Sequence, residues 1–179
     1  LEDAGRNLLQ AIAVYLELPE GYFEEFVING NSILRAIHYF PIENPDAISA
    51  DAVRAGAHED INLITLLIGA SADGLEVLTK DNTWFPIKAK GEDIVVNVGD
   101  MLQRLTNNKL KSTTHRVVNP PRELMKTSRY SVPFFLHPKA SMSLASLDST
   151  ISEEYPKLYE DYTAGQYLDE RLREIGLKM

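Results

Sequence analysis

The first thirty residues place apolar side chains at helical intervals. Residues 3–17 carry Leu8, Ile12, Tyr15 and Leu16 near helical spacing. This spacing predicts an amphipathic helix that ends before Pro19. A second short helix is expected over residues 19–26, followed by a turn at residues 30–31, where Gly and Asn stand. The pattern therefore predicts a helical lead-in over residues 1–29.

From residue 33 onward the pattern changes to short segments rich in β-branched and aromatic residues. The segments are ILRAIHYF, LITLLIG, LEVLT, WFPIK, IVVNVG, HRVVN and YSVPFFL. They are separated by Gly, Asn, Asp and Pro, at a spacing of about ten residues, which is typical of an antiparallel sandwich or barrel. Residues 100–107 predict a short helical interruption. We therefore expect a β-sheet core over about residues 30–140.

The last part of the chain returns to a helical pattern. Thr163 and Gln166 have the spacing of a capping box, and Gly176 supplies a stop. Between them lies an apolar stripe formed by Leu168, Leu172 and Ile175. We expect C-terminal helices over about residues 150–176, packed outside the strands, and a single domain over residues 1–179.

Composition narrows the classes of function. The 18 Lys and Arg residues against 26 Asp and Glu give a net charge of −8, which gives no reason to expect a nucleic-acid partner. The apolar runs are far shorter than the roughly 20 residues that cross a bilayer, so no membrane span is expected. The sequence contains no cysteine, which excludes thiolate metal sites and fits a reducing compartment. We therefore expect a cytoplasmic protein that would bind a metal through His and carboxylate side chains.

Three ionisable residues stand in a row before the apolar run LITLL. In an extended strand, residues two apart share a face, so His58 and Asp60 project together while Glu59 points the other way. An isolated His-x-Asp is more often a hydrogen-bonded surface pair than a ligand pair. The His-x-Asp motif therefore indicates a metal site only when other candidate ligands accompany it.

A second pair with the same spacing lies in SRYSVPFFL. Arg129 offers a fork for a carboxylate and Ser131 a hydroxyl on the same face. Between the two pairs, His115 begins another apolar strand. Two histidines and one carboxylate form the facial triad that suits non-haem Fe(II) oxygenases.

The ordered set of His58-x-Asp60, His115 and Arg129-x-Ser131 resembles the signature of the isopenicillin N synthase-like 2-oxoglutarate/Fe(II)-dependent oxygenases. The segments GLEVLTKDNTWFPIK and VNVGDMLQRLTNNKLKSTTHRVVN are also similar to stretches of that family. The resemblance covers roughly residues 30–140, with a weaker match at the C-terminal helix.

The resemblance implies a mainly β fold: a double-stranded β-helix, or cupin-like jelly-roll barrel, flanked by N- and C-terminal α-helices. His58, Asp60 and His115 would bind Fe(II). The co-substrate 2-oxoglutarate would chelate the iron at one end and meet Arg129 and Ser131 with its far carboxylate. Dioxygen and 2-oxoglutarate would then yield succinate and carbon dioxide while a small organic molecule is oxidised.

Two departures from the family pattern stand out. Plant relatives that use 2-oxoglutarate often read Asn-Tyr-Tyr-Pro in the strand before the triad, where this chain has His38, Tyr39, Phe40 and Pro41. We expect His38 to donate a hydrogen bond to the co-substrate in place of the Asn. The usual N-terminal family region is also missing from this sequence, which would leave an edge of the barrel to be covered by a homo-oligomer or another partner.

Two alternatives to the dioxygenase stay open. Relatives that lack 2-oxoglutarate keep an Arg-x-Ser that binds the substrate's own carboxylate, so the chain could be an oxidase that uses Fe(II) and dioxygen alone. A barrel that binds a metal or a carboxylate without catalysing a reaction is the other alternative, although the complete ligand set argues against it.

Overall fold

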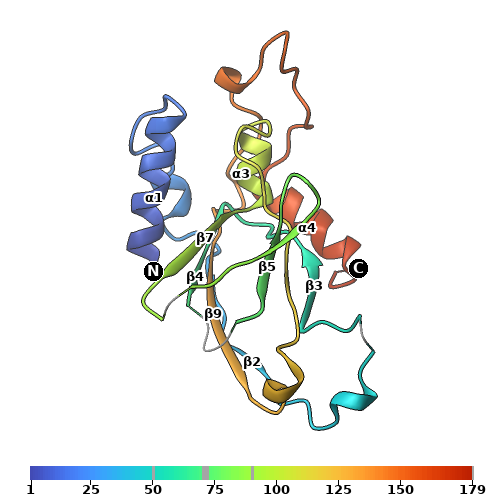
Figure 1. Ribbon diagram of the computed structural model, residues 1–179. Helices are drawn as coiled ribbons and strands as arrows, with labels where there is room; N and C mark the ends of the chain where they lie inside the picture. Colours follow the sequence, from blue (N-terminus) through green and yellow to red (C-terminus); the bar gives the residue numbers. More distant parts are fainter. Residues whose placement is uncertain (50, 70–72, 90, 179) are drawn as a thin grey trace.

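Two antiparallel sheets face each other in the computed structural model, which describes residues 1–49, 51–69, 73–89 and 91–178 (Figure 1). The larger sheet has the order β1-β9-β4-β7, with β2 also paired to β9, and the smaller sheet has the order β3-β8-β5-β6. The strands are β1 (Ile33–Leu34), β2 (Ile37–Tyr39), β3 (Ala55–His58), β4 (Ile64–Ile68), β5 (Leu75–Leu78), β6 (Trp84–Pro86), β7 (Ile94–Val98), β8 (His115–Val117) and β9 (Arg129–Leu136).

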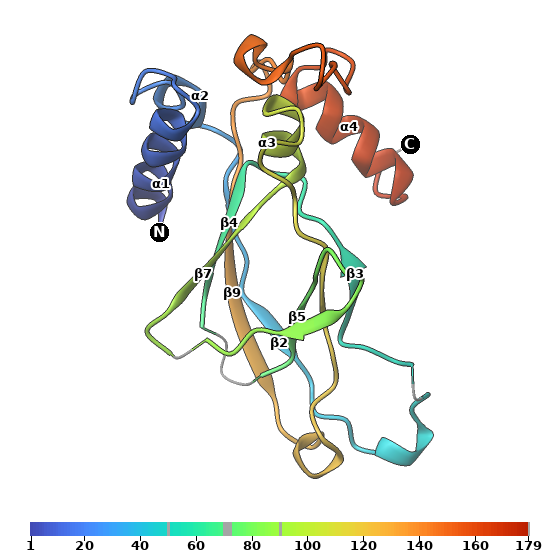
Figure 2. The ribbon, with the colours of Figure 1, turned by 45° about the horizontal axis from the view of Figure 1, so that its top comes forward.

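The α-helices gather at one end of the two sheets (Figure 1, Figure 2). They are α1 (Glu2–Tyr15), α2 (Glu24–Val27), α3 (Asp100–Leu105) and α4 (Ala164–Glu174). Short 3-10 turns stand at Pro45–Ala47, Arg122–Leu124 and Asp148–Thr150. Among the described residues, no helix combines the length and the apolar character needed to cross a membrane.

The chain passes back and forth between the two sheets as it runs from β2 to β9. Strands β4, β7 and β9 join the larger sheet, whereas β3, β5, β6 and β8 join the smaller one. This is the connectivity of a jelly roll, and it confirms the mainly β fold class predicted from the sequence. The described strands form two separate hydrogen-bonded sheets and do not close into a continuous barrel.

One part of the hydrophobic core lies between α1 and the outer face of the larger sheet, and the core continues to α3 and α4. Leu9 and Ala13 of α1 are fully buried together with Leu66 of β4 and Leu136 of β9. Gly5 lets the helix approach closely, since a Cβ at this position would stand 3.0 Å from a methyl carbon of Leu136. Leu66 and Leu136 face the helix, so their strand neighbours face the space between the sheets.

Helix α4 begins as its sequence predicted. The side chain of Thr163 accepts a hydrogen bond from the Gln166 backbone N–H, and the Gln166 side chain accepts one from the Thr163 N–H, which completes the capping box. The preceding segment from residue 151 to 163 has no helix, whereas helices were expected from about residue 150. Proline at position 156 removes a backbone donor from that segment.

Candidate functional site

The two histidines and the aspartate of the predicted triad meet at the helical end of the sheets. His58 ends β3, His115 begins β8, and the two residues stand directly opposite each other in the antiparallel register. Asp60 follows β3 in the connection to β4. One ligand atom from each side chain lies within 4.8 Å of the others. Asp60 is buried, His115 is half-buried and His58 is exposed, so the group is open on one side.

Backbone carbonyls fix the orientation of both imidazole rings. His58 Nδ1 lies 2.7 Å from the Gly56 carbonyl oxygen, and His115 Nδ1 lies 3.0 Å from the carbonyl oxygen of Thr113. Since a carbonyl oxygen can only accept, Nδ1 donates in each case and carries the proton. The lone pair of each Nε2 is therefore left for a metal ion.

The carboxylate of Asp60 is held through one of its two oxygens. Oδ2 accepts hydrogen bonds from Thr65 Oγ1 at 2.6 Å and from Asn97 Nδ2 at 2.9 Å. Asn62 Nδ2 in turn donates to Thr65 Oγ1 at 2.9 Å, which directs the Thr65 hydroxyl hydrogen toward Asp60. The other carboxylate oxygen, Oδ1, lies 3.9 Å from His115 Nε2 and faces the site. Such outer partners orient a metal-binding carboxylate.

The start of α3 positions the loop that carries Asp60. The Asp100 N–H donates to the Asp60 carbonyl oxygen at 2.7 Å, and the Met101 N–H donates to that of Asn62 at 3.1 Å. Gly99 makes this approach possible, because a Cβ there would stand 2.3 Å from both the backbone and the side-chain oxygen of Asn62. The sequence Val-Gly-Asp at the start of α3 thus helps to place Asp60.

Asp100 itself is a buried carboxyl group beside this loop. Burial raises its pKa to about 6, and the neighbouring Glu59 carboxyl group adds to the increase. The Tyr167 hydroxyl donates to Asp100 Oδ2 at 3.2 Å. Burial and the nearby Asp100 raise the pKa of Tyr167, so its hydroxyl stays protonated and donates at neutral pH.

Arg129 and Ser131 line the same cavity as the triad, at its opposite end along β9. The cavity has a volume of about 290 Å³. Both side chains are buried, with Arg129 only 2% exposed. The Arg129 guanidinium carbon lies 5.0 Å from the centre of the Tyr39 ring. Burial lowers the pKa of Arg129 from its usual value, while Tyr39 opposes the decrease.

His38 does not join the other predicted site residues. Its ring stacks on Tyr130 at 4.5 Å between ring centres, and its Nε2 lies 2.9 Å from Ser128 Oγ. Because alternate strand residues face opposite sides, Ile37 and Tyr39 line the cavity and His38 lies outside it. The expectation that His38 contacts the co-substrate therefore gains no support from its position.

Tyr39, Thr65 and Asn97 are the site residues that the sequence reasoning missed. Thr65 and Asn97 are paired in the register of β4 and β7, and both side chains point between the sheets. Each is a polar residue within an apolar strand, in LITLL and IVVNV. A polar residue buried in such a strand needs a hydrogen-bond partner. A polar residue within an apolar strand is therefore the sequence signal that could have identified Thr65 and Asn97.

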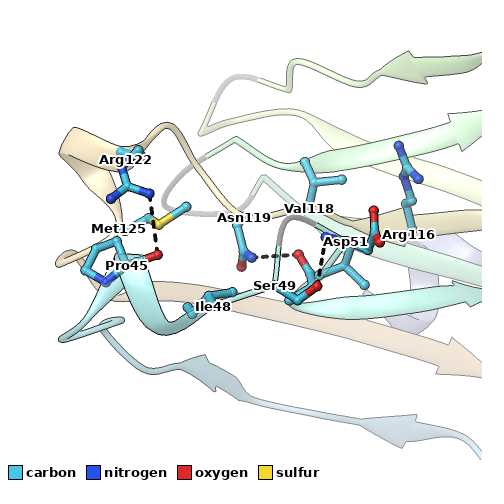
Figure 3. A pocket seen from close by; sticks show the side chains of 11 residues that line it. Pro45, Ile48, Ser49, Asp51, Arg116, Val118, Asn119, Arg122 and Met125 are labelled. Atoms are coloured by element: carbon cyan, nitrogen blue, oxygen red, sulfur yellow. Dashed lines mark hydrogen bonds between the residues drawn. The ribbon is translucent and has the colours of Figure 1, made fainter.

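A separate cavity of about 540 Å³ lies on the outer side of β8 (Figure 3). There Arg122 Nη1 donates to the Pro45 carbonyl oxygen at 3.5 Å, and Asn119 Nδ2 donates to that of Ala52 at 2.7 Å. Arg116 lines this cavity, whereas its neighbour His115 lines the inner one. The strand therefore separates the two cavities, and the predicted residues converge on the inner one.

Comparison with known protein families gives an independent result. The model of the 2OG-Fe(II) oxygenase superfamily matches residues 30–138. The 2-oxoglutarate-Fe(II) type oxidoreductase ppzD of Metarhizium majus is 36% identical over 93% of this chain and 49% of its own length. The proline hydroxylase buaE of Petromyces alliaceus is 39% identical over 93% of this chain and 54% of its own.

Solved structures agree with the sequence comparison. A Caulobacter crescentus protein assigned to the 2OG-Fe(II) oxygenase family is 48% identical, with a TM-score of 0.88 over 97% of this chain and 55% of its own. A Neurospora crassa protein solved in complex with alpha-KG is 34% identical, with a TM-score of 0.87 over 96% of this chain and 54% of its own. This chain thus spans about half the length of the relatives that it matches.

Proposed function

Because this chain belongs to the 2OG-Fe(II) oxygenase superfamily, we propose that it forms the catalytic core of a dioxygenase that oxidises a small organic molecule. In the proposed reaction, 2-oxoglutarate and dioxygen yield succinate and carbon dioxide while the substrate is oxidised by hydroxylation, desaturation or ring closure. One observation carries the proposal: the His58, Asp60 and His115 group and the Arg129 and Ser131 pair line a single cavity.

The donor set fits Fe(II). Two imidazoles and one carboxylate, open on one side, are the ligands typical of non-haem Fe(II) oxygenases. The orientation of the site supports this choice, because both Nε2 atoms and Asp60 Oδ1 are the atoms left free by the surrounding hydrogen bonds. When bound, the iron would supply the redox chemistry that activates dioxygen.

Arg129 and Ser131 would hold the far carboxylate of 2-oxoglutarate. A guanidinium pairs with a carboxylate through two parallel hydrogen bonds, and the Ser131 hydroxyl adds another donor. Burial of Arg129 strengthens this attraction, since charges interact more strongly away from water. A co-substrate anchored there would extend along the cavity with its keto acid end toward the triad.

The oxidase alternative is less well supported than the dioxygenase. The Neurospora crassa protein, which shares the fold and is 34% identical in sequence to this chain, was solved with alpha-KG. Several relatives also carry 2-oxoglutarate in their names. Consumption of dioxygen without 2-oxoglutarate would nevertheless favour an oxidase.

The cysteine-free sequence supports a cytoplasmic location as part of the same proposal. The homo-oligomer that the sequence led us to expect stays a prediction, which the mass of the protein in solution would test.

The proposal is tested by measuring succinate formation from 2-oxoglutarate under air, with and without Fe(II). We expect iron-dependent succinate formation that His58→Ala and Asp60→Ala abolish. Asp81→Asn, a substitution of an exposed acid in the turn between β5 and β6, serves as the matched control and should keep the rate. Equal rates in the two triad variants and the unsubstituted chain would overturn the proposal.

A further inference from the structure

A third cavity, of about 560 Å³ and called the α4 cavity below, adjoins the inner cavity that the triad lines. It lies between the triad and α4, and its apolar wall includes Leu168, Leu172 and Ile175 of the C-terminal stripe. Four residues line both cavities: Arg35, His58, Asp60 and Phe135. The inner cavity and the α4 cavity therefore meet at the triad. A molecule in the α4 cavity would lie beside the metal ligands.

Arg35 occupies the boundary between the cavities because of its place in the sheet. Its N–H donates to the Pro133 carbonyl oxygen at 3.0 Å, which keeps the segment between β1 and β2 extended along β9. Alternation then places Ile33, Arg35 and Ile37 on the side that lines the cavities, where the Ile33 and Arg35 side chains remain exposed to solvent. The guanidinium carbon of Arg35 lies 5.7 Å from the centre of the Phe135 ring.

The charge of Arg35 lacks a carboxylate partner in the part of the chain that the structure describes, where no acidic oxygen comes within 4.0 Å of it. Asp60 belongs to the triad, and the other acids that line the α4 cavity are engaged elsewhere. Glu59 accepts a hydrogen bond from Thr114 at 2.7 Å, Asp100 accepts one from Tyr167, and Glu174 pairs with Arg171.

We propose that Arg35 binds an anionic group of the substrate that is oxidised, which makes this substrate a small organic acid. Its carboxylate would contact the Arg35 guanidinium, and its apolar body would pack on Phe135 and the α4 stripe beside the triad. The inference rests on the proposed dioxygenase function and adds the substrate class and the residue that selects it. Arg129 serves the co-substrate, so the two arginines have separate ligands.

Ligand-observed NMR on the chain loaded with Zn(II) and 2-oxoglutarate tests this assignment. The probes are phenylacetate, hexanoate and L-proline, each paired with its primary amide. We expect at least one acid to bind more tightly than its amide. Arg35→Gln should weaken that acid about tenfold or more, since a charge-assisted hydrogen bond is lost. Arg35→Lys should lose less, because it keeps the charge without the fork.

Arg122→Gln is the matched control, since Arg122 pairs with Asp46 on the outer side of β8. It should leave acid binding unchanged.

Calorimetric titration with 2-oxoglutarate separates the Arg35 assignment from the proposed function. Arg35→Gln should bind 2-oxoglutarate with the dissociation constant of the unsubstituted chain. Three results would overturn the Arg35 assignment alone, provided that 2-oxoglutarate binds the unsubstituted chain normally. They are equal binding of the acids and their amides, an unchanged affinity of Arg35→Gln for the acid, and no binding of any acid at millimolar concentration. Failure of 2-oxoglutarate to bind the unsubstituted chain would remove the proposed function first.

Discussion

The hydrogen bond from Thr65 to Asp60 offers a test of how the fold prepares a metal ligand. Thr65→Val keeps the shape of the side chain and removes the hydroxyl that donates to Asp60 Oδ2 at 2.6 Å. Asn97 then remains as a donor to this oxygen, at 2.9 Å. Asn62 loses the Thr65 acceptor but keeps the Ile64 carbonyl oxygen at 2.9 Å. The substitution therefore loosens one carboxylate without removing a ligand.

The expected magnitude follows from the charge and burial of the acceptor. A hydrogen bond to a charged group contributes about 1.5–3 kcal/mol, and Asp60 is only 7% exposed. Loss of an outer partner of a metal ligand typically weakens metal binding by about 10- to 100-fold. We expect Thr65→Val to lower the affinity for Fe(II) within this range while the chain stays folded.

Anaerobic calorimetric titration with Fe(II) measures the effect, and circular dichroism checks the fold. Thr114→Val is the matched control, since Thr114 also donates to a carboxylate, at 2.7 Å, but to Glu59 rather than to a triad residue. Its Fe(II) affinity should equal that of the unsubstituted chain. An unchanged affinity in folded Thr65→Val, or an equal loss in Thr114→Val, would refute the reasoning.

Two further predictions concern the loop and the co-substrate. Gly99→Ala should destabilise the fold by about 1–3 kcal/mol in urea unfolding, because the added Cβ would stand 2.3 Å from two oxygens of Asn62. Gly21→Ala is the control and should not show this loss, since the space around Gly21 is open. Equal stability of the two variants would contradict the packing argument. Arg129→Gln should raise the dissociation constant of 2-oxoglutarate about tenfold or more while Fe(II) still binds. In anaerobic calorimetry, unchanged 2-oxoglutarate affinity would show that Arg129 does not hold the co-substrate.

Local sequence signals predicted much of the architecture. The β-branched and aromatic segments separated by turn residues, the capping box of Thr163 and Gln166, and the helical interruption after Gly99 all correspond to observed elements. The triad spacing was also informative, because His58 and Asp60 lie two apart and His115 begins a later strand. These features depend on residues close together in the chain, which is why pattern alone reveals them.

The face of the strand that carries His38 could not be predicted in the same way. ILRAIHYF has apolar residues at both odd and even positions, so alternation alone does not say which side faces inward. Pairing with β9 decides it: His38 stands opposite Tyr130 and Tyr39 opposite Arg129. The registry of two strands far apart in sequence thus places Tyr39, rather than His38, in the cavity.

The outer partners of Asp60 depend on long-range pairing as well. Thr65 and Asn97 become neighbours only through the register of β4 and β7. Their joint hydrogen bonds to one oxygen of Asp60 follow from that register and from the loop held by α3. A single sequence shows that both residues are polar within apolar strands, but it does not show which group they share.

The central claim is that His58, Asp60 and His115 hold one Fe(II) ion to which 2-oxoglutarate binds. Anaerobic titration of the chain with Fe(II) and 2-oxoglutarate, followed through the visible absorption of the iron complex, tests it most directly. The account predicts one iron per chain, loss of the absorption band in His58→Ala, Asp60→Ala and His115→Ala, and an unchanged band in Glu59→Gln, the acid that stands between two ligands. A band that persists in the Asp60→Ala chain, or one that disappears in Glu59→Gln while the fold is intact, would contradict it.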